Sequence, residues 1–152
     1  MPGVHFDVTV RIEADPGRVW ALLVDVETWP SWTPSMTSVK RTDGGPLAVG
    51  SAARIRQPRI GTMLWRVTEL TEGQSFTWEA RRPGVHVVAS HVIEEAAPGQ
   101  TQVVLSIEQG GLLGSALAYL TAALARRNVE MEAQGLKTRA ESRTDPRPDS
   151  EV

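Results

Sequence analysis

The feature that most constrains the fold is a run of short strand-like segments followed by one long helical pattern. Between residues 36 and 109, these segments are separated by the turn-like stretches DGGP, PRIG, TEGQ, RPG and APGQ. Connections this short join antiparallel neighbours, so the run predicts a meander. Strands are expected at about 36–42, 51–57, 62–71, 74–82, 85–95 and 101–109.

The N-terminal part predicts one more strand and two short helices. Apolar and polar residues alternate over 6–12, which is typical of a half-buried strand. Asp15 suits the N-cap of a helix and Pro16 its first position. Pro30 and Pro34 then limit the stretch DVETWPSWTPSM to a short second helix and a turn.

A long amphipathic helix is predicted near the end of the chain, beginning at Gly111 to Gly114. The chain of 152 residues is long enough for one domain with a substantial core, expected over 1–142. The polar, proline-containing tail 143–152 is expected to be disordered. Apolar positions of the helix recur three, four or seven residues apart, and they are Leu113, Leu117, Leu120, Leu124 and Met131, continued by Leu136 and Ala140.

This order of elements predicts an α+β fold. A curved seven-stranded antiparallel sheet would wrap around the long C-terminal helix, with the two short helices after the first strand. The helix has to bury its apolar stripe against one face of the sheet. A strongly curved sheet can leave a gap beside the helix, and such a gap is a natural ligand site.

Composition excludes several classes of function. The chain has no cysteine, so disulfides, thiolate nucleophiles and cysteine-ligated metal sites are impossible. A formal net charge of −2 gives no reason to expect nucleic acid or an anionic membrane as a partner. The N-terminus lacks the apolar core of a signal peptide, and the most apolar segment, 112–125, is too short to span a bilayer. A cytoplasmic protein is therefore expected.

Three segments resemble the helix-grip superfamily called SRPBCC, which includes START lipid-transfer domains and birch-allergen-like proteins. They are DPGRVWALLVDVETWPSW (15–32), LWRVTELTEGQSFTW (64–78) and EAQGLKTRAES at the end of the last helix. Within the superfamily, the chain is most similar to the bacterial polyketide cyclase/dehydrase and lipid transport group, over about residues 4–142. The resemblance implies a helix-grip fold with a cavity for an apolar or aromatic ligand. It implies no single reaction, because the superfamily contains cyclases, carriers and receptors.

Aromatic side chains are the first candidates for a ligand site, and each has an alternative role in the core. Trp29 and Trp32 are three residues apart, so they share one side of a short helix. They either form an end wall of the pocket or plug the base of the sheet. Phe76 and Trp78 share one strand face, and Trp65 is expected to face the same way. These side chains could stack on a flat ligand or fill the space that a ligand would occupy.

The polar candidates are His91, Tyr119 and Asn128. His91 lies on the more uniformly apolar face of its strand, where a histidine can polarise a carbonyl group or move a proton. The alternatives are a hydrogen-bonded histidine in the core or an exposed one. Asn128 follows Leu124 by about one helical turn, so its amide and the Tyr119 hydroxyl could reach a ligand. They could equally bond to backbone or water.

The stretch RQPRIGTM (56–63) could be a mobile lip over the pocket entrance or only a surface hairpin. Arg56 and Arg59 could attract an anionic ligand group there, or be ordinary surface cations. The chain has neither a phosphate-binding loop nor a serine nucleophile elbow. No metal or cofactor is predicted, because the histidines lack the spacing of common metal sites: His5, His86 and His91.

Three functions are compatible with these observations. The preferred one is a carrier, sensor or polyketide-related binding protein that holds a small apolar or aromatic molecule between sheet and helix. The second is an aromatase/cyclase or dehydratase acting on a polyketide-like substrate, with His91 or a tyrosine hydroxyl assisting. The third is an interaction module without a small ligand, which forms a homodimer through an exposed strand edge.

Overall fold

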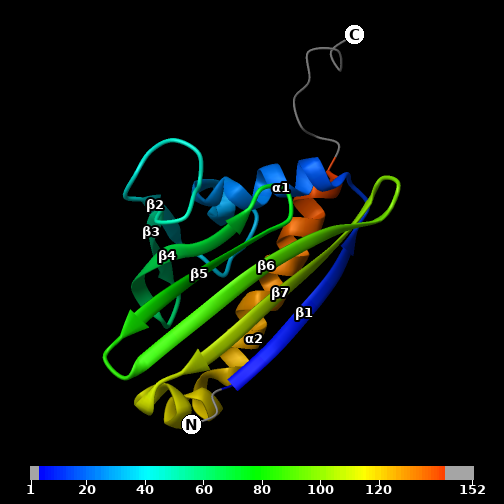
Figure 1. Cartoon of the computed structure of the whole chain (residues 1–152). Helices are drawn as coiled ribbons and strands as arrows, with labels where there is room; N and C mark the ends of the chain where they lie inside the picture. Colours follow the sequence, from blue (N-terminus) through cyan, green and yellow to red (C-terminus); the bar gives the residue numbers. More distant parts are fainter. Residues whose placement is uncertain (1–3, 143–152) are drawn as a thin grey trace.

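In the computed structural model, a seven-stranded antiparallel sheet curves around one long C-terminal helix (Figure 1). The structure describes residues 4–142, with the backbone alone for 112–122. The predicted α+β helix-grip fold is confirmed. Its elements are β1 (Val4–Ile12), α1 (Pro16–Val24), the 3-10 helix η1 (Val26–Ser31), β2 (Ser38–Arg41), β3 (Ala52–Gln57), β4 (Gly61–Thr71), β5 (Ser75–Arg82), β6 (Val85–Ala97), β7 (Gln100–Gly110) and α2 (Leu112–Glu141).

The sheet is the predicted meander with one strand added at its end. Its order is β1-β7-β6-β5-β4-β3-β2, so each strand from β2 to β7 pairs with the next one along the chain, and β1 pairs with β7. The predicted strand bounds agree with the structure to within two residues. A register shift between Val67 and Glu69 bends β4. The expected disordered tail lies outside the described residues.

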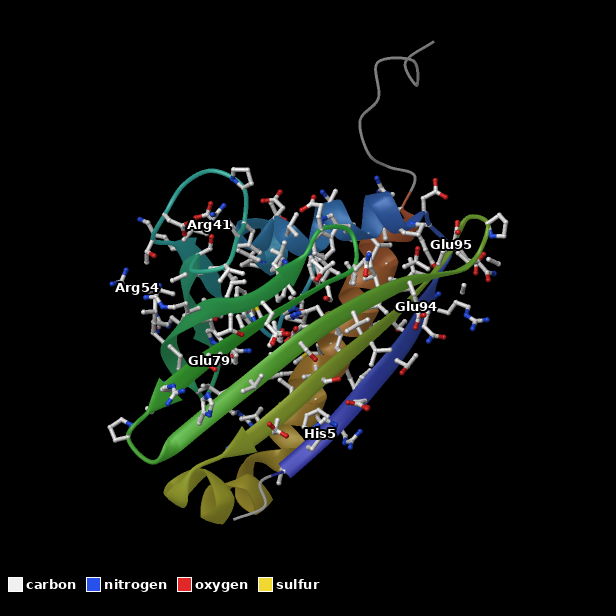
Figure 2. The ribbon with its side chains drawn as sticks, in the orientation of Figure 1. His5, Arg41, Arg54, Glu79, Glu94 and Glu95 are labelled. Atoms are coloured by element: carbon white, nitrogen blue, oxygen red, sulfur yellow. The ribbon has the colours of Figure 1, made fainter. Side chains whose placement is uncertain are left out.

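The inner face of the sheet carries the core. Along β4, the residues Met63, Trp65 and Val67 are buried and their neighbours are exposed. The outer face carries mostly polar side chains, with Leu64 and Val92 also exposed on it, and Figure 2 shows Arg54 and Glu94 there, pointing away from α2. None of the helices in the described part of the chain is long and apolar enough to cross a membrane. The predicted helix positions Leu113, Leu117 and Leu120 lie outside the described side chains.

The C-terminal end of α2 is fastened to α1 and β1. The side chain of Arg18 donates hydrogen bonds to the carbonyls of Ala140, at 2.7 Å, and Arg139, at 3.2 Å. These carbonyls belong to the last turn of α2, where the regular helical pattern leaves carbonyls without a donor, and that of Arg139 also accepts from the Ser142 N–H at 3.2 Å. The Lys137 ammonium donates to the Arg11 carbonyl at 2.8 Å. These bonds fix where α2 crosses the sheet.

Gly135 allows α2 to lie directly against the segment that follows η1. A Cβ at Gly135 would overlap the carbonyl oxygen of Trp32 and would lie 3.2 Å from its ring atom Cε3. Both obstacles are well fixed, because the first is backbone and the second is a half-buried indole. A side chain at this position would therefore push helix and segment apart.

We predict that Gly135→Ala destabilises the fold by about 1–3 kcal/mol or more, the usual cost of overpacking. A loss of stability would be informative, because replacing glycine by alanine inside a helix ordinarily raises the free energy of unfolding by about 0.5–1 kcal/mol. Gly17→Ala is the matched control, because a Cβ there meets nothing within 4 Å. Urea unfolding monitored by circular dichroism would measure both variants. Equal stability of the two variants would contradict the packing described here.

Candidate functional site

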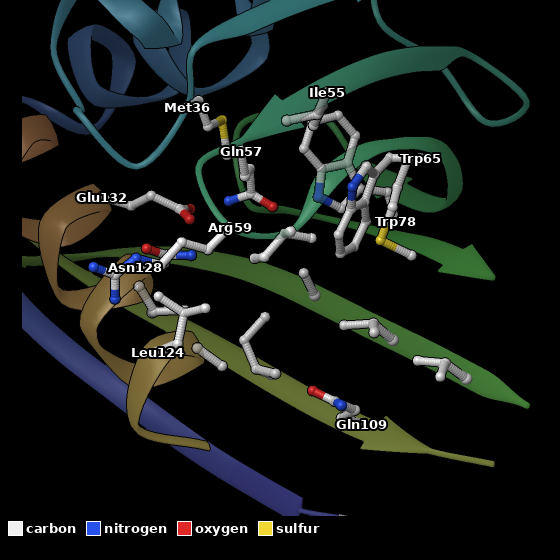
Figure 3. Close-up of a pocket in the computed structure, with 18 of the residues that line it drawn as sticks. Met36, Ile55, Gln57, Arg59, Trp65, Trp78, Gln109, Leu124, Asn128 and Glu132 are labelled. Carbon is white, nitrogen blue, oxygen red and sulfur yellow. The ribbon is translucent and has the colours of Figure 1, made fainter. Parts of the chain in front are cut away.

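A cavity of about 250 Å³ lies between the inner face of the sheet and α2 (Figure 3). Apolar side chains from β3 to β7, η1 and α2 form most of its wall. Figure 3 shows Trp65 and Trp78 on one side, with Asn128 and Glu132 across the cavity on α2. The polar side chains of the lining include Gln57, Arg59, His91, Asn128 and Glu132.

Three tryptophans form the aromatic side of the cavity. The ring centroids of Trp65 and Trp78 are 5.8 Å apart, and those of Trp29 and Trp78 are 5.4 Å apart. The indole N–H of Trp29 donates to the Leu23 carbonyl at 3.1 Å, which fixes that ring. The Nε1 of Trp65 is buried and has no hydrogen-bond partner in the described part of the chain. The tryptophan rings thus give this side of the cavity a flat, mostly apolar surface.

The structure brings most of the predicted site residues together. Phe76 is fully buried behind the cavity wall and does not line it. Trp32 contacts the Trp29 ring, with centroids 5.4 Å apart, but borders a shallow groove beside Gly135. The side chain of Tyr119 lies outside the described residues. The predicted residues that line the cavity are Trp29, Trp65, Trp78, His91 and Asn128.

His91 is buried and held by the backbone of the neighbouring strand. Its Nδ1 lies 3.1 Å from the Phe76 carbonyl oxygen, so Nδ1 carries the hydrogen and Nε2 the lone pair. The ring also stacks on Phe76 at a centroid distance of 4.2 Å. Burial lowers the pKa of His91 to about 4. His91 is therefore a neutral hydrogen-bond acceptor at neutral pH.

Glu132 is the residue that the sequence analysis missed. It lies one helical turn after Asn128, and Figure 3 shows its carboxyl group directed into the cavity, near Gln57 and Arg59. Burial raises the pKa of this carboxyl group from its ordinary 4.5 to about 8. The four-residue spacing from Asn128 was the available signal, since residues four apart share a helix face.

The hairpin between β3 and β4 borders the cavity. The Arg82 guanidinium donates hydrogen bonds to the carbonyls of Ile60, at 2.8 Å, and Thr62, at 3.2 Å. Arg59 adopts a positive φ of 70° in the turn. Arg59 and Ile60 line the cavity, whereas Arg56, the other candidate cation of this stretch, does not. The stretch is thus a tight hairpin whose tip lies at the cavity.

Within residues 4–142, no group of three or more histidine or acidic side chains could hold a metal ion.

The sequence matches one family model over nearly its whole length. The model described as "Polyketide cyclase / dehydrase and lipid transport" covers residues 3–141. The chain belongs to this family. A search of curated protein sequences finds no significant match.

Several solved structures have the same fold. The Zhui aromatase/cyclase from a Streptomyces species has 18% identity and a TM-score of 0.78, over 98% of this chain and 99% of that one. A START superfamily protein from Mycobacterium smegmatis has 18% identity and a TM-score of 0.72, over 90% and 97%. Ara h 8.0201 has 13% identity and a TM-score of 0.72, over 90% and 97%. At these identities the likeness shows a shared START-like helix-grip fold.

The raised pKa of Glu132 gives a testable dependence of stability on pH. Between pH 4.5 and about 8 the unfolded chain has released the proton that the folded chain keeps, so the free energy of unfolding falls as pH rises. Glu132→Gln removes this loss. We predict that the variant gains stability relative to wild type from pH 5 to 8.5, by at most about 5 kcal/mol at about 1.36 kcal/mol per pKa unit.

Urea unfolding at a series of pH values would measure this difference. Glu130→Gln is the control, because Glu130 is exposed on the same helix. Its difference from wild type should stay flat over this range. A flat difference for Glu132→Gln as well would contradict a neutral Glu132 in the folded protein.

Proposed function

We propose that this protein binds a small, flat and mostly apolar ligand in the cavity between the sheet and α2. The observation that carries the proposal is a cavity of about 250 Å³ with Trp65 and Trp78 along one side. An engineered apolar cavity of about 150 Å³ binds benzene, so this one suits a somewhat larger ring system. Indole faces favour flat partners through offset stacking. The family description, which includes lipid transport, supports the same kind of ligand.

A hydrogen bond and a ring contact outside the cavity hold its aromatic wall residues in place. Trp29 is fixed by its bond to Leu23, and Phe76 packs edge-on against Trp78 at a centroid distance of 5.3 Å. A pre-formed pocket of this kind loses little conformational entropy when a ligand enters. These contacts support ligand binding over an interior that collapses on itself.

Catalysis is the second candidate, because two neutral groups of the cavity could exchange protons with a ligand. Glu132 on α2 retains its proton at neutral pH, and Nε2 of His91 on β6 has a free lone pair. Ring closure of a poly-carbonyl chain takes a proton from a carbon between two carbonyls and gives one to the carbonyl oxygen that becomes a hydroxyl group. The "cyclase / dehydrase" of the family description and the aromatase/cyclase relative support this alternative.

The catalytic candidate predicts turnover that depends on both groups. A poly-carbonyl thioester would be incubated with the protein, and formation of the aromatic product followed by absorbance. Glu132→Gln and His91→Phe should each lower the rate at least tenfold, in the range typical of a lost acid or base. Glu130→Gln should leave it unchanged. Binding of the thioester without any turnover above the uncatalysed rate would favour a carrier.

The ligand-binding proposal predicts that a ring placed in the cavity blocks it. Ala125 lines the cavity on α2, whereas Ala123 is exposed on the same helix. Ala125→Phe should lower the affinity for naphthylmethanol, a two-ring probe, at least tenfold. Ala123→Phe should leave the affinity within about twofold of wild type. Isothermal titration calorimetry measures both, and equal affinities of the two variants would place the probe elsewhere.

Homodimerisation through a strand edge also remains a proposal. The edge strands of the sheet are β1 and β2, and β2 has only four residues. β1 is the longer edge, and it alternates exposed with partly buried or buried side chains. A second copy would therefore pair with β1, the longer edge, before Arg11, whose carbonyl already accepts from Lys137.

A further inference from the structure

The cavity contains polar groups that the fold leaves without partners. Glu132 forms no hydrogen bond or ion pair within the described residues, and neither does the side chain of Asn128, which is only 6% exposed. A polar side chain left without a partner in an apolar surrounding is costly. Two such groups one helical turn apart on one cavity wall indicate that a bound molecule completes their hydrogen bonding.

Glu132 is the acidic member of the described cavity lining, and no cation of the described residues neutralises it. The Arg82 guanidinium is engaged with the carbonyls of Ile60 and Thr62. Arg59 is exposed in the β3–β4 turn and forms no ion pair with Glu132. His91, on the sheet side of the cavity, is neutral. No hydrogen bond or ion pair within the described residues gives the Glu132 carboxyl group a role in holding the fold together.

We propose that the cavity selects a flat apolar ring system carrying one basic nitrogen, and that this nitrogen forms an ion pair with Glu132 and a hydrogen bond with the side-chain oxygen of Asn128. This inference rests on the proposed ligand-binding function and specifies its ligand class. Glu132 and Asn128 are one helical turn apart, so their side chains can reach the same ligand atom.

A basic nitrogen satisfies this site better than a hydroxyl group does. Charge-assisted hydrogen bonds are roughly twice as strong as neutral ones, and the low dielectric of an apolar cavity strengthens them further. A carboxylate ligand is negatively charged, so it cannot serve as the counterion of an ionised Glu132.

Binding of an amine changes the protonation of Glu132. A free amine probe is an ammonium ion at neutral pH, whereas Glu132 in the empty cavity holds a proton. When the ammonium ion binds, the carboxyl group becomes a carboxylate and its proton leaves to solvent. Amine binding at pH 7 therefore releases about one proton per ligand, and amine affinity rises as pH increases from 6 to 8. His91, which also lines the cavity, has a pKa of about 4 and stays neutral over this range.

A matched set of probes tests the inference: naphthylmethylamine, naphthylmethanol and naphthoic acid. Calorimetry at pH 7 in buffers of different ionisation enthalpy gives both the affinity and the number of protons released. The amine should bind at least tenfold more tightly than the alcohol, and the acid should bind most weakly. Only the amine should release a proton. Glu132→Gln should abolish the amine preference and the proton release, and keep the alcohol affinity within about twofold.

Glu130→Gln, which removes an exposed carboxylate from the same helix, should change none of these quantities. Equal binding of amine and alcohol by the wild-type protein would overturn this inference and leave the proposed ligand cavity standing. An amine preference that persists in Glu132→Gln would overturn the assignment to Glu132. Failure of all three probes to bind would overturn the proposed function for two-ring ligands, and this inference with it.

Discussion

The structure depends on how α2 is seated across the concave face of the sheet. Bonds from Arg18 and Lys137 fasten its C-terminal end, and Gly135 lets it contact the backbone at Trp32. There the helix packs tightly, with Leu136 completely buried. The sheet curves away from the earlier turns, so the same face of the helix borders a cavity where Asn128 and Glu132 lie. One packing arrangement thus produces both the core and the site.

Burial shifts the pKa values of two cavity groups, His91 and Glu132, in opposite directions and leaves both of them neutral near pH 7. It lowers the pKa of His91 and raises that of Glu132, because in each case the neutral form is the one that an apolar environment tolerates. The empty cavity therefore carries no buried charge near neutral pH. A ligand that brings its own charge can change this state, whereas an apolar ligand leaves it unchanged.

The fold was predictable because one-sided burial imposes a period of two on each strand, and short turns leave only a meander. The site was less predictable from the sequence than the fold. Spacing placed Trp29 and Trp32 on one side of a short helix, and their rings do meet, but η1 ends at Ser31 and Trp32 turns toward Gly135. Glu132 was missed because a charged residue beside an apolar stripe is usually solvated. Its spacing of four from Asn128 places it on the same helix face, and the curvature of the sheet makes that face border a cavity.

The central claim is that the space between α2 and the sheet is open and mainly apolar. Xenon binds in dry apolar cavities, independently of ligand functional groups. Crystals pressurised with xenon test the claim most directly. A xenon atom is expected between Ala125 and the rings of Trp65 and Trp78. An interior without xenon, filled by repacked tryptophan side chains, would contradict it.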